Sequence, residues 1–259
     1  MEKITSAANR WVKLAGQLKM KKYRDREGLF LMEGIRSGEE AASQRRRDAV
    51  CFVTGKALSL PRVQAVLEKA SGLHWLVLET EESLIEKMSG TEHGQGMLCL
   101  LRKEQRSLPE PGKMHGRYVL LDGVQDPGNM GTILRTSAAA GCEGVLLMEG
   151  CTDPYAEKAV RSSMGSILRI PVYEHVTVEA LSALGKGIFL AGAALEGGRP
   201  YREVSLPADA VIAFGNEGSG LREEVLALCR ERIFIPMARS VESLNVAASA
   251  AVLLFHYKE

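Results

Sequence analysis

Short apolar runs alternate with mixed segments along the whole chain. In the second half, near-continuous apolar runs recur and segments of helical character separate them. Strands that are apolar at nearly every position are typical of a parallel sheet that is covered on both faces. The pattern therefore predicts an α/β fold whose strands lie within YVLLDGV (118–124), GVLLME (144–149), ILRIPVYE (167–174), IFLAGAAL (188–195), AVIAFGN (210–216) and RIFIPM (232–237).

The first half shows the same alternation in a smaller α/β unit. We expect strands at 29–33, 49–54, 74–79 and 96–101, with helices from about residue 35 and around 63–70. The stretch RKEQRSLPEPGKMHG (102–116) is polar and rich in proline and glycine, a composition typical of a linker. We predict a domain at 1–105, a linker at 106–116 and a second domain at 117–259.

Two helices of the second half carry boundary signals. Asp153-Pro154 has the composition of an N-cap followed by a first helical residue, and Gly141 follows three alanines as a stop. We therefore expect a helix to begin at Pro154, with Asp153 as its N-cap, and another to end at Gly141. A third helix is expected over 221–229.

Positive charge is concentrated at the start of a nearly neutral chain. The net charge of all 259 residues is +1, but residues 1–47 hold 12 Lys and Arg against six Asp and Glu. Such a segment suits contact with phosphate backbones, although runs of charge also occur on helix faces that only meet solvent.

Two classes of protein are not supported. The five cysteines contain no C-x-x-C pair and the five histidines show no close pairing, so we expect neither a metal site nor a disulfide framework. The first residues lack the apolar core of a signal peptide, and the longest nearly apolar run, 246–255, is too short to span a bilayer. We expect a cytoplasmic protein without a membrane segment.

Ligands of open parallel sheets bind beyond the carboxyl ends of the strands. Four loops in those places are unusual in composition, and none has the glycine pattern of a dinucleotide fold or a P-loop, which leaves another nucleoside-containing ligand open. These loops are DGVQDPGNMGTILR (122–135), AGAALEGG (191–198), AFGNEGSGL (213–221) and IPMARSVESLN (235–245).

Each of these loops also has a simpler structural interpretation. Asn129 and Arg135 suit an anion such as an RNA phosphate, or they belong to a glycine-rich turn with a surface arginine. The glycines around Glu217 allow close approach to a ligand, or they form a tight turn that Ser219 caps. The small residues at 247–251 are more typical of a helix packed in a core or interface than of a cofactor contact.

The order and spacing of three of these segments resemble the SpoU branch of the SPOUT RNA methyltransferases. The resemblance rests on DPGNMGTILRTSAAAG (126–141), AFGNEGSGLREEV (213–225) and IPMARSVESLNVAASAAVLLF (235–255). More loosely, residues 29–41 and 93–100 are similar to the family's small RNA-binding domain, which is like ribosomal protein L30e.

The resemblance implies a deep trefoil knot, a homodimer that forms through the knotted domain, and S-adenosylmethionine as the cofactor without a metal. It implies cofactor contacts from Ala194, Leu195, Gly215, Ile235, Met237 and Leu244. It implies a reactive set of Asn129, Arg135, Glu217, Ser243 and Asn245. Because a guanidinium stays protonated, we interpret Arg135 as a group that positions phosphate and stabilises developing negative charge.

The function that the resemblance implies is 2′-O-methylation of a ribose in a structured RNA, with ribosomal RNA as the first candidate. Two alternatives stay open at this point. One is methylation of transfer RNA, and the other is an RNA-binding or ribosome-assembly protein that keeps the fold without catalysis.

Overall fold

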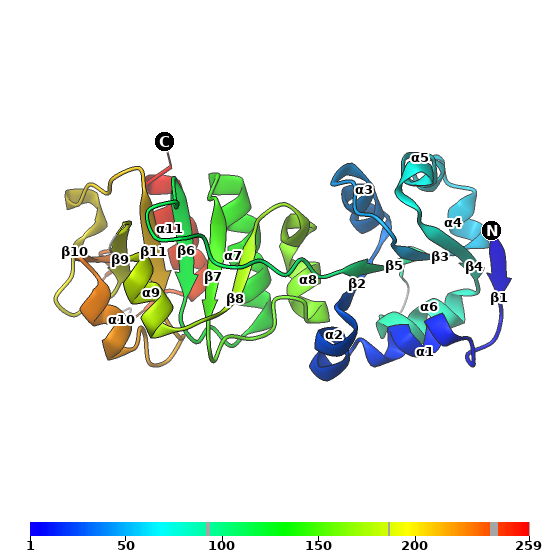
Figure 1. Ribbon diagram of the computed structural model, residues 1–259, viewed down its shortest axis with the longest axis horizontal. Coiled ribbons are helices and arrows are strands. Elements are labelled where there is room, and N and C mark those ends of the chain that lie inside the picture. The colour runs from blue at the N-terminus through cyan, green and yellow to red at the C-terminus, as the bar shows by residue number, and fades with distance from the viewer. Residues whose placement is uncertain (92–93, 186, 239–242, 259) are drawn as a thin grey trace. The chain divides into compact units, whose positions relative to one another are not determined.

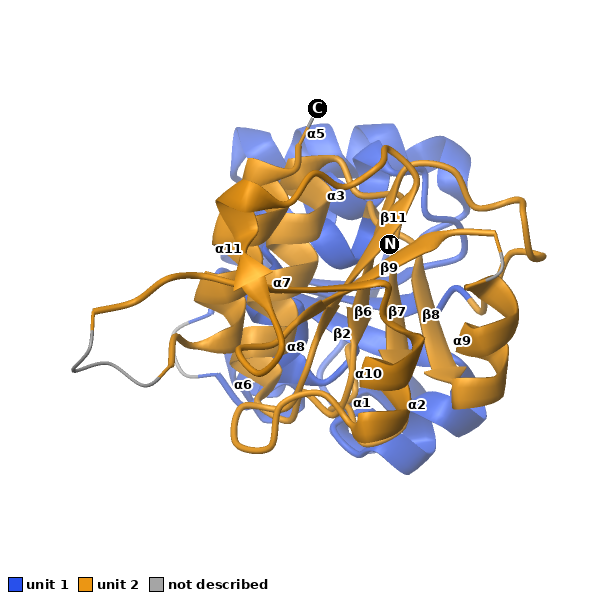
Figure 2. Ribbon diagram, turned by 90° about the vertical axis from the view of Figure 1, so that its left-hand side faces the viewer, with its two compact units in different colours: residues 1–104, 155–168 blue, residues 105–154, 169–259 orange. Residues whose placement is uncertain are grey.

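The computed structural model describes residues 1–91, 94–185, 187–238 and 243–258, and the chain forms two compact units (Figures 1 and 2). Unit 1 comprises Met1–Glu104 and Tyr155–Leu168, and unit 2 comprises Gln105–Pro154 and Arg169–Glu259. The segment Tyr155–Leu168 thus packs with the N-terminal part of the chain, whereas the sequence pattern gave no sign of this. The domain boundaries inferred from the sequence stay predictions.

Unit 1 is built on a five-stranded mixed sheet in the order β1-β4-β3-β5-β2, with β5 antiparallel to both of its neighbours. Helices α1 and α6 pack on one face of the sheet, where alternate strand residues such as Phe52 and Leu98 form a buried cluster. Helices α3 and α5 lie together on the other face (Figure 1). The strands are β1 (Glu2–Ile4), β2 (Leu29–Glu33), β3 (Val50–Thr54), β4 (Leu76–Thr80) and β5 (Met97–Arg102).

The helices of unit 1 confirm those expected after residue 35 and around 63–70. They are α1 (Arg10–Gln17), α2 (Lys21–Glu27), α3 (Ile35–Ser43), α4 (Gly55–Leu58), α5 (Pro61–Ala70), α6 (Glu82–Ser89) and α8 (Glu157–Ser163), with 3-10 turns η1 (Ser71–Leu73) and η2 (Ser166–Leu168).

Unit 2 is built on a seven-stranded sheet in the order β10-β12-β9-β11-β6-β7-β8, and every neighbouring pair is parallel. This confirms the prediction of a parallel α/β fold. Helices α7 and α11 cover one face, and α9 and α10 cover the other (Figure 2). The strands are β6 (Arg117–Leu121), β7 (Gly144–Met148), β8 (Val172–Val176), β9 (Phe189–Ala193), β10 (Arg199–Pro200), β11 (Ala210–Phe214) and β12 (Glu231–Phe234). The helices are α7 (Pro127–Ala140), α9 (Val178–Leu184), α10 (Glu223–Leu228) and α11 (Val246–His256), with the turn η3 (Tyr201–Glu203).

Two helix boundaries test the capping signals. Gly141 ends α7 with φ of 79°, as predicted, because glycine adopts the left-handed conformation without a steric cost. The start predicted at Pro154, with Asp153 as its N-cap, is wrong, since α8 begins at Glu157 with Ala156 as its N-cap. The backbone before it is held elsewhere: the N–H of Thr152 donates to the carbonyl of Val124 at 2.8 Å.

The C-terminal helix α11 packs against α7, and the residues that follow it are also fastened. The hydroxyl of Tyr257 donates to the carbonyl oxygens of Tyr201 and Val204, at 2.7 and 3.2 Å. The trefoil knot stays a prediction. Within the described residues, no helix has the length and apolar character needed to cross a membrane.

Candidate active site

A cavity of about 440 Å³ lies in unit 2 where three neighbouring strands end. Strands β9, β11 and β12 are adjacent in the sheet, so the loops that follow them meet at one edge, and the start of α11 closes the cavity. Glu217 and Ser243 line it, and so does each of the six residues inferred as cofactor contacts: Ala194, Leu195, Gly215, Ile235, Met237 and Leu244. Residues 239–242 of the third motif lie outside the described part of the chain.

The composition of the cavity fits a nucleoside that carries a positive charge. Its volume lies in the range of about 300–1,000 Å³ that small-molecule sites occupy. Phe214 and Leu253 supply apolar wall, and Glu196 and Glu223 supply carboxyl groups. S-adenosylmethionine combines an adenine ring with a sulfonium, and these residues suit both. Among the described residues, no cluster of three or more His, Cys, Asp or Glu side chains could hold a metal ion.

Gly215 stands where no other residue fits. A Cβ built on it would overlap the backbone of Gly220 and Leu221. The chain folds back on itself here, because the N–H groups of Asn216 and Gly220 donate to each other's carbonyl oxygens at 2.9 and 3.0 Å. The glycine therefore allows the loop after β11 to close.

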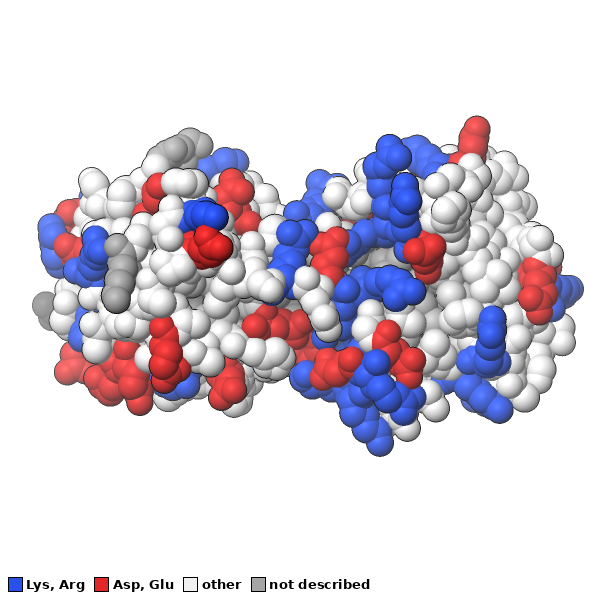
Figure 3. All heavy atoms as spheres, viewed as in Figure 1, with Lys and Arg blue, Asp and Glu red and all other residues white. Residues whose placement is uncertain are grey.

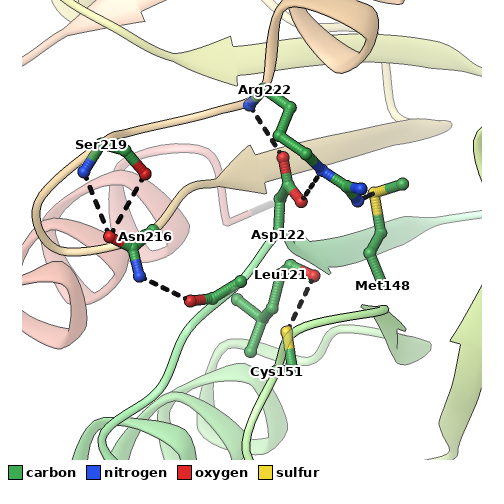
Figure 4. Close-up of polar contacts among 8 residues, drawn as sticks. Leu121, Asp122, Met148, Cys151, Asn216, Ser219 and Arg222 are labelled. Carbon is green, nitrogen blue, oxygen red and sulfur yellow. Dashed lines mark hydrogen bonds and ion pairs between the residues drawn. The ribbon is translucent and has the colours of Figure 1, made fainter.

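Asn216, which sequence reasoning missed, organises that loop (Figure 4). Its Oδ1 accepts from the backbone N–H groups of Gly218 and Ser219, at 2.9 and 3.1 Å. The interpretation of Ser219 as a helix cap is wrong, because its hydroxyl points to Asn216 and the N-cap of α10 is Arg222. An asparagine followed by Gly and Ser two and three residues later is the signal that could have predicted this turn.

Three residues of the inferred reactive set are joined by hydrogen bonds. Nδ2 of Asn129 donates to Oε1 of Glu217 at 2.9 Å. Nδ2 of Asn245 donates to Oδ1 of Asn129, also at 2.9 Å. Because Glu217 lines the cavity, this cluster of Asn129, Glu217 and Asn245, here called the amide cluster, adjoins it.

The direction of each bond in the amide cluster follows from the helix that begins beside it. Asn245 is the N-cap of α11, and its Oδ1 accepts from the N–H groups of Ala247 and Ala248. Its Nδ2 must therefore point to Asn129, whose oxygen accepts and whose Nδ2 turns toward Glu217. The cap of one helix thus fixes the amide orientation at the start of another.

Glu217 is held as a carboxylate. Burial raises its pKa, but the hydrogen bond from Asn129, together with backbone N–H groups that include that of Gln125, outweighs burial and lowers the pKa below its usual value. A carboxylate with a low pKa is a weak base at neutral pH. The geometry assigns Glu217 to orienting Asn129.

Arg135 lies apart from the amide cluster. It is six residues after Asn129 on α7, which puts it about 120° around the helix. Its side chain is exposed, and none of the described residues gives it a hydrogen bond or an ion pair. The structure therefore brings together four of the five inferred reactive residues at or beside the cavity, and leaves Arg135 on the outer side of α7.

The fold and the site together define a family. Residues 116–255 match the SpoU rRNA Methylase family, and residues 9–99 match the MRM3-like substrate binding domain. The chain belongs to the SpoU rRNA methylase family, as its motifs predicted.

Relatives that span the whole chain agree with this. The chain is 32% identical over 259 residues to the 23S rRNA (guanosine(2553)-2'-O)-methyltransferase RlmP of Bacillus subtilis. The match covers 100% of this chain and 100% of that protein. The structure resembles an AdoMet-bound rRNA methyltransferase from Sinorhizobium meliloti with a TM-score of 0.89, at 29% identity over 99% of this chain and 97% of that one. It also resembles the SpoU methyltransferase AviRb from Streptomyces viridochromogenes in complex with AdoMet, with a TM-score of 0.83. That match has 25% identity and covers 96% of this chain and 97% of the other.

Proposed function

We propose that this protein transfers the methyl group of S-adenosylmethionine to a ribose 2′-hydroxyl of ribosomal RNA. The observation that carries the proposal is the amide cluster, whose Glu217 is also a wall of the cavity. A group that orients a ribose thus stands beside a cavity suited to the methyl donor. The relative from Bacillus subtilis is a 23S rRNA 2′-O-methyltransferase, and the one from Sinorhizobium meliloti is an AdoMet-bound rRNA methyltransferase.

Bound S-adenosylmethionine supplies a methyl group that its own positive charge activates. The chain's residues then have to hold a ribose hydroxyl in line with that methyl group and share its proton. Asn129 offers its second N–H and a lone pair to the ribose, and Ser243 lies on the cavity wall. Arg135 stabilises phosphate and alkoxide charge, and the proton goes to a phosphate oxygen or a neighbouring group.

The protein works as a homodimer in this proposal. The outer side of α11 carries Val252 and Phe255, which are 38% and 51% exposed. Large apolar residues at this spacing on one helix face suit burial against a second copy of the chain. Arg135 is exposed on α7, against which α11 packs, so the same contact would bring it into a shared site.

Unit 1 provides the contact with RNA. Residues 10–27, which form α1 and α2, hold seven Lys and Arg against two Asp and Glu. Figure 3 shows Lys and Arg side chains gathered over these two helices. Arg10 lies over the ring of Trp11, and Lys22 and Arg26 lie over that of Tyr23, at 4.7 to 4.9 Å. Cations held against aromatic rings are suited to RNA phosphates and unstacked bases.

One assay tests the activity and the class of substrate together. The protein is incubated with methyl-labelled S-adenosylmethionine and unmodified ribosomal RNA or transfer RNA. The proposal expects label in ribosomal RNA. Label in transfer RNA alone would change the substrate, and tight binding of RNA without label would leave the non-catalytic alternative. We also propose that the protein works in the cytoplasm.

A further inference from the structure

The loop after β11 is fastened at both ends to the residues that follow β6 (Figure 4). At its start, Nδ2 of Asn216 donates to the carbonyl of Gly123 at 2.8 Å. At its end, the backbone N–H and Nε of Arg222 donate to the two carboxyl oxygens of Asp122, at 2.9 and 2.7 Å. We propose that these four residues form a clamp, and that Asp122 and Asn216 are positioning residues that set Glu217 for methyl transfer.

The ion pair at one end of the clamp is built on a buried group. The side chain of Asp122 is 1% exposed, and it directly follows the last residue of β6. A buried carboxyl group is costly without partners, and here one residue supplies two donors. Nη2 of Arg222 lies 3.5 Å from the sulfur of Met148 in β7, which fixes the other side of the guanidinium. The position of Arg222 is therefore tied to two strands.

The strand side of the clamp is held as well. The N–H of Asp122 donates to the carbonyl of Phe214 at 2.9 Å, which continues the pairing of β6 with β11. The thiol of Cys151 donates to the carbonyl of Leu121 at 3.2 Å (Figure 4). The loop after β11 is thus fastened to a rigid part of unit 2.

All the residues between Asn216 and Arg222, the two ends of the clamped loop, belong to the cavity wall. Residues 217–221 line the cavity, and Glu217 at their start holds the amide cluster. A displacement of this loop would move the methyl-donor site and Asn129 together, and a misplacement of about 1 Å at a reacting centre can cost about 10²-fold in rate. Asp122 is not among the described residues that line the cavity, and its carboxyl group contacts Arg222 at the end of the loop, so the effect of changing that carboxyl group passes through the loop. The part of the inference that concerns rate rests on the proposed function.

Two substitutions in the full-length protein loosen the clamp without removing a side chain. Asp122→Asn keeps the shape of the group, but its NH2 faces one of the two donors of Arg222. Asn216→Asp keeps the oxygen that the N–H groups of Gly218 and Ser219 need, and replaces the donor to Gly123 with a negatively charged carboxylate oxygen. Arg202→Gln, on the exposed part of unit 2, is the control. Melting temperatures establish that each variant is folded at the assay temperature.

The decisive readout is a double-mutant cycle with Asn129→Ala. We expect Asp122→Asn and Asn216→Asp each to lower kcat about tenfold, and Asn129→Ala to lower it about 100-fold. If the clamp acts through Glu217 and Asn129, adding either clamp substitution to Asn129→Ala lowers kcat no further. Losses that multiply would overturn the inference, as would wild-type kcat in a folded clamp variant. Arg222→Lys, which keeps charge and the backbone donor, should recover part of the loss that Arg222→Gln causes.

Calorimetry with S-adenosylmethionine separates this inference from the proposed function. Both clamp variants should bind it about tenfold more weakly than the wild type or Arg202→Gln, since the cavity wall moves. If the wild type methylates no RNA, the proposed function fails and the binding measurement still tests the clamp. Wild-type affinity in both folded variants would then contradict it.

Discussion

The side-chain amide of Asn245 donates to Oδ1 of Asn129 across 2.9 Å, and so joins the N-cap of α11 to the first turn of α7. The two residues are 116 positions apart in the sequence. Because the oxygen of Asn245 is committed to the helix, its nitrogen has only one direction to point. The orientation of Asn129, where we propose that the ribose binds, is therefore set by helix capping.

Asn245→Asp separates the two tasks of this side chain. The carboxylate still caps α11 but cannot donate to Asn129, so the melting temperature should stay near that of the wild type while the rate of methyl transfer falls about 100-fold. Asn245→Ala should lose the rate and also about 1 kcal/mol of stability, the usual worth of an N-cap. Thermal unfolding and single-turnover transfer measure the two effects. A wild-type rate for Asn245→Asp would mean that the bond to Asn129 has no part in the reaction.

Two glycines of the same loop give a matched pair. In Gly215→Ala the new methyl group would overlap the backbone of Gly220 and Leu221, and such strain costs about 1–3 kcal/mol. The affinity for S-adenosylmethionine should fall about tenfold or more. A Cβ at Gly218 would meet only Oδ1 of Asn216 at 3.5 Å, so Gly218→Ala should bind normally. Equal affinities by calorimetry would remove the steric account of Gly215.

The low pKa of Glu217 predicts how the rate depends on pH. Burial raises the pKa, and the bonds from Asn129 and the backbone lower it further than burial raises it. A carboxylate with a depressed pKa contributes its stabilisation above the ordinary pKa and loses it as pH falls through the depressed value. Between about pH 5.5 and 9, the rate should therefore show no change caused by Glu217.

Glu217→Gln provides the check on that profile. Its amide oxygen still accepts from Asn129, so the rate should fall only about tenfold with an unchanged pH profile. If Glu217 were the base, the loss would exceed about 10³-fold and the acid limb of the wild-type profile would disappear.

Salt dependence tests the role of α1 and α2. Arg10, Lys13 and Lys22 are exposed, and replacing all three with glutamine should weaken RNA binding and make its dependence on salt shallower, by about 0.7–0.9 in log–log slope for each lost phosphate contact. The control replaces the same number of exposed arginines in unit 2: Arg199, Arg202 and Arg230. Filter binding over a range of salt concentrations measures both. Identical slopes for the wild type and the α1 and α2 variant would show that these helices are exposed to solvent and do not contact RNA.

Much of the cavity could be predicted from the sequence, because parallel strands end at one edge and the family motifs mark the loops that follow. The clamp could not. Asp122 and Arg222 lie 100 positions apart, and nothing local in the sequence pairs them. The packing of Tyr155 on Phe30, with ring centroids 4.9 Å apart, could not be predicted from the sequence for the same reason. The roles assigned to Asn129, Arg135, Glu217, Ser243 and Asn245 stay predictions, and Arg135 lies outside the amide cluster that Asn129, Glu217 and Asn245 form.

The most direct test of the central claim is the chemical identity of the methylated product. Unmodified ribosomal RNA is incubated with the protein and methyl-labelled S-adenosylmethionine, then hydrolysed with alkali, which needs a free 2′-hydroxyl to cleave the chain. Arg135→Ala is the control, and should bind S-adenosylmethionine normally yet transfer nothing. We predict label in an alkali-resistant dinucleotide that releases a 2′-O-methylnucleoside. Label in a methylated base, or equal transfer by Arg135→Ala, would contradict the account.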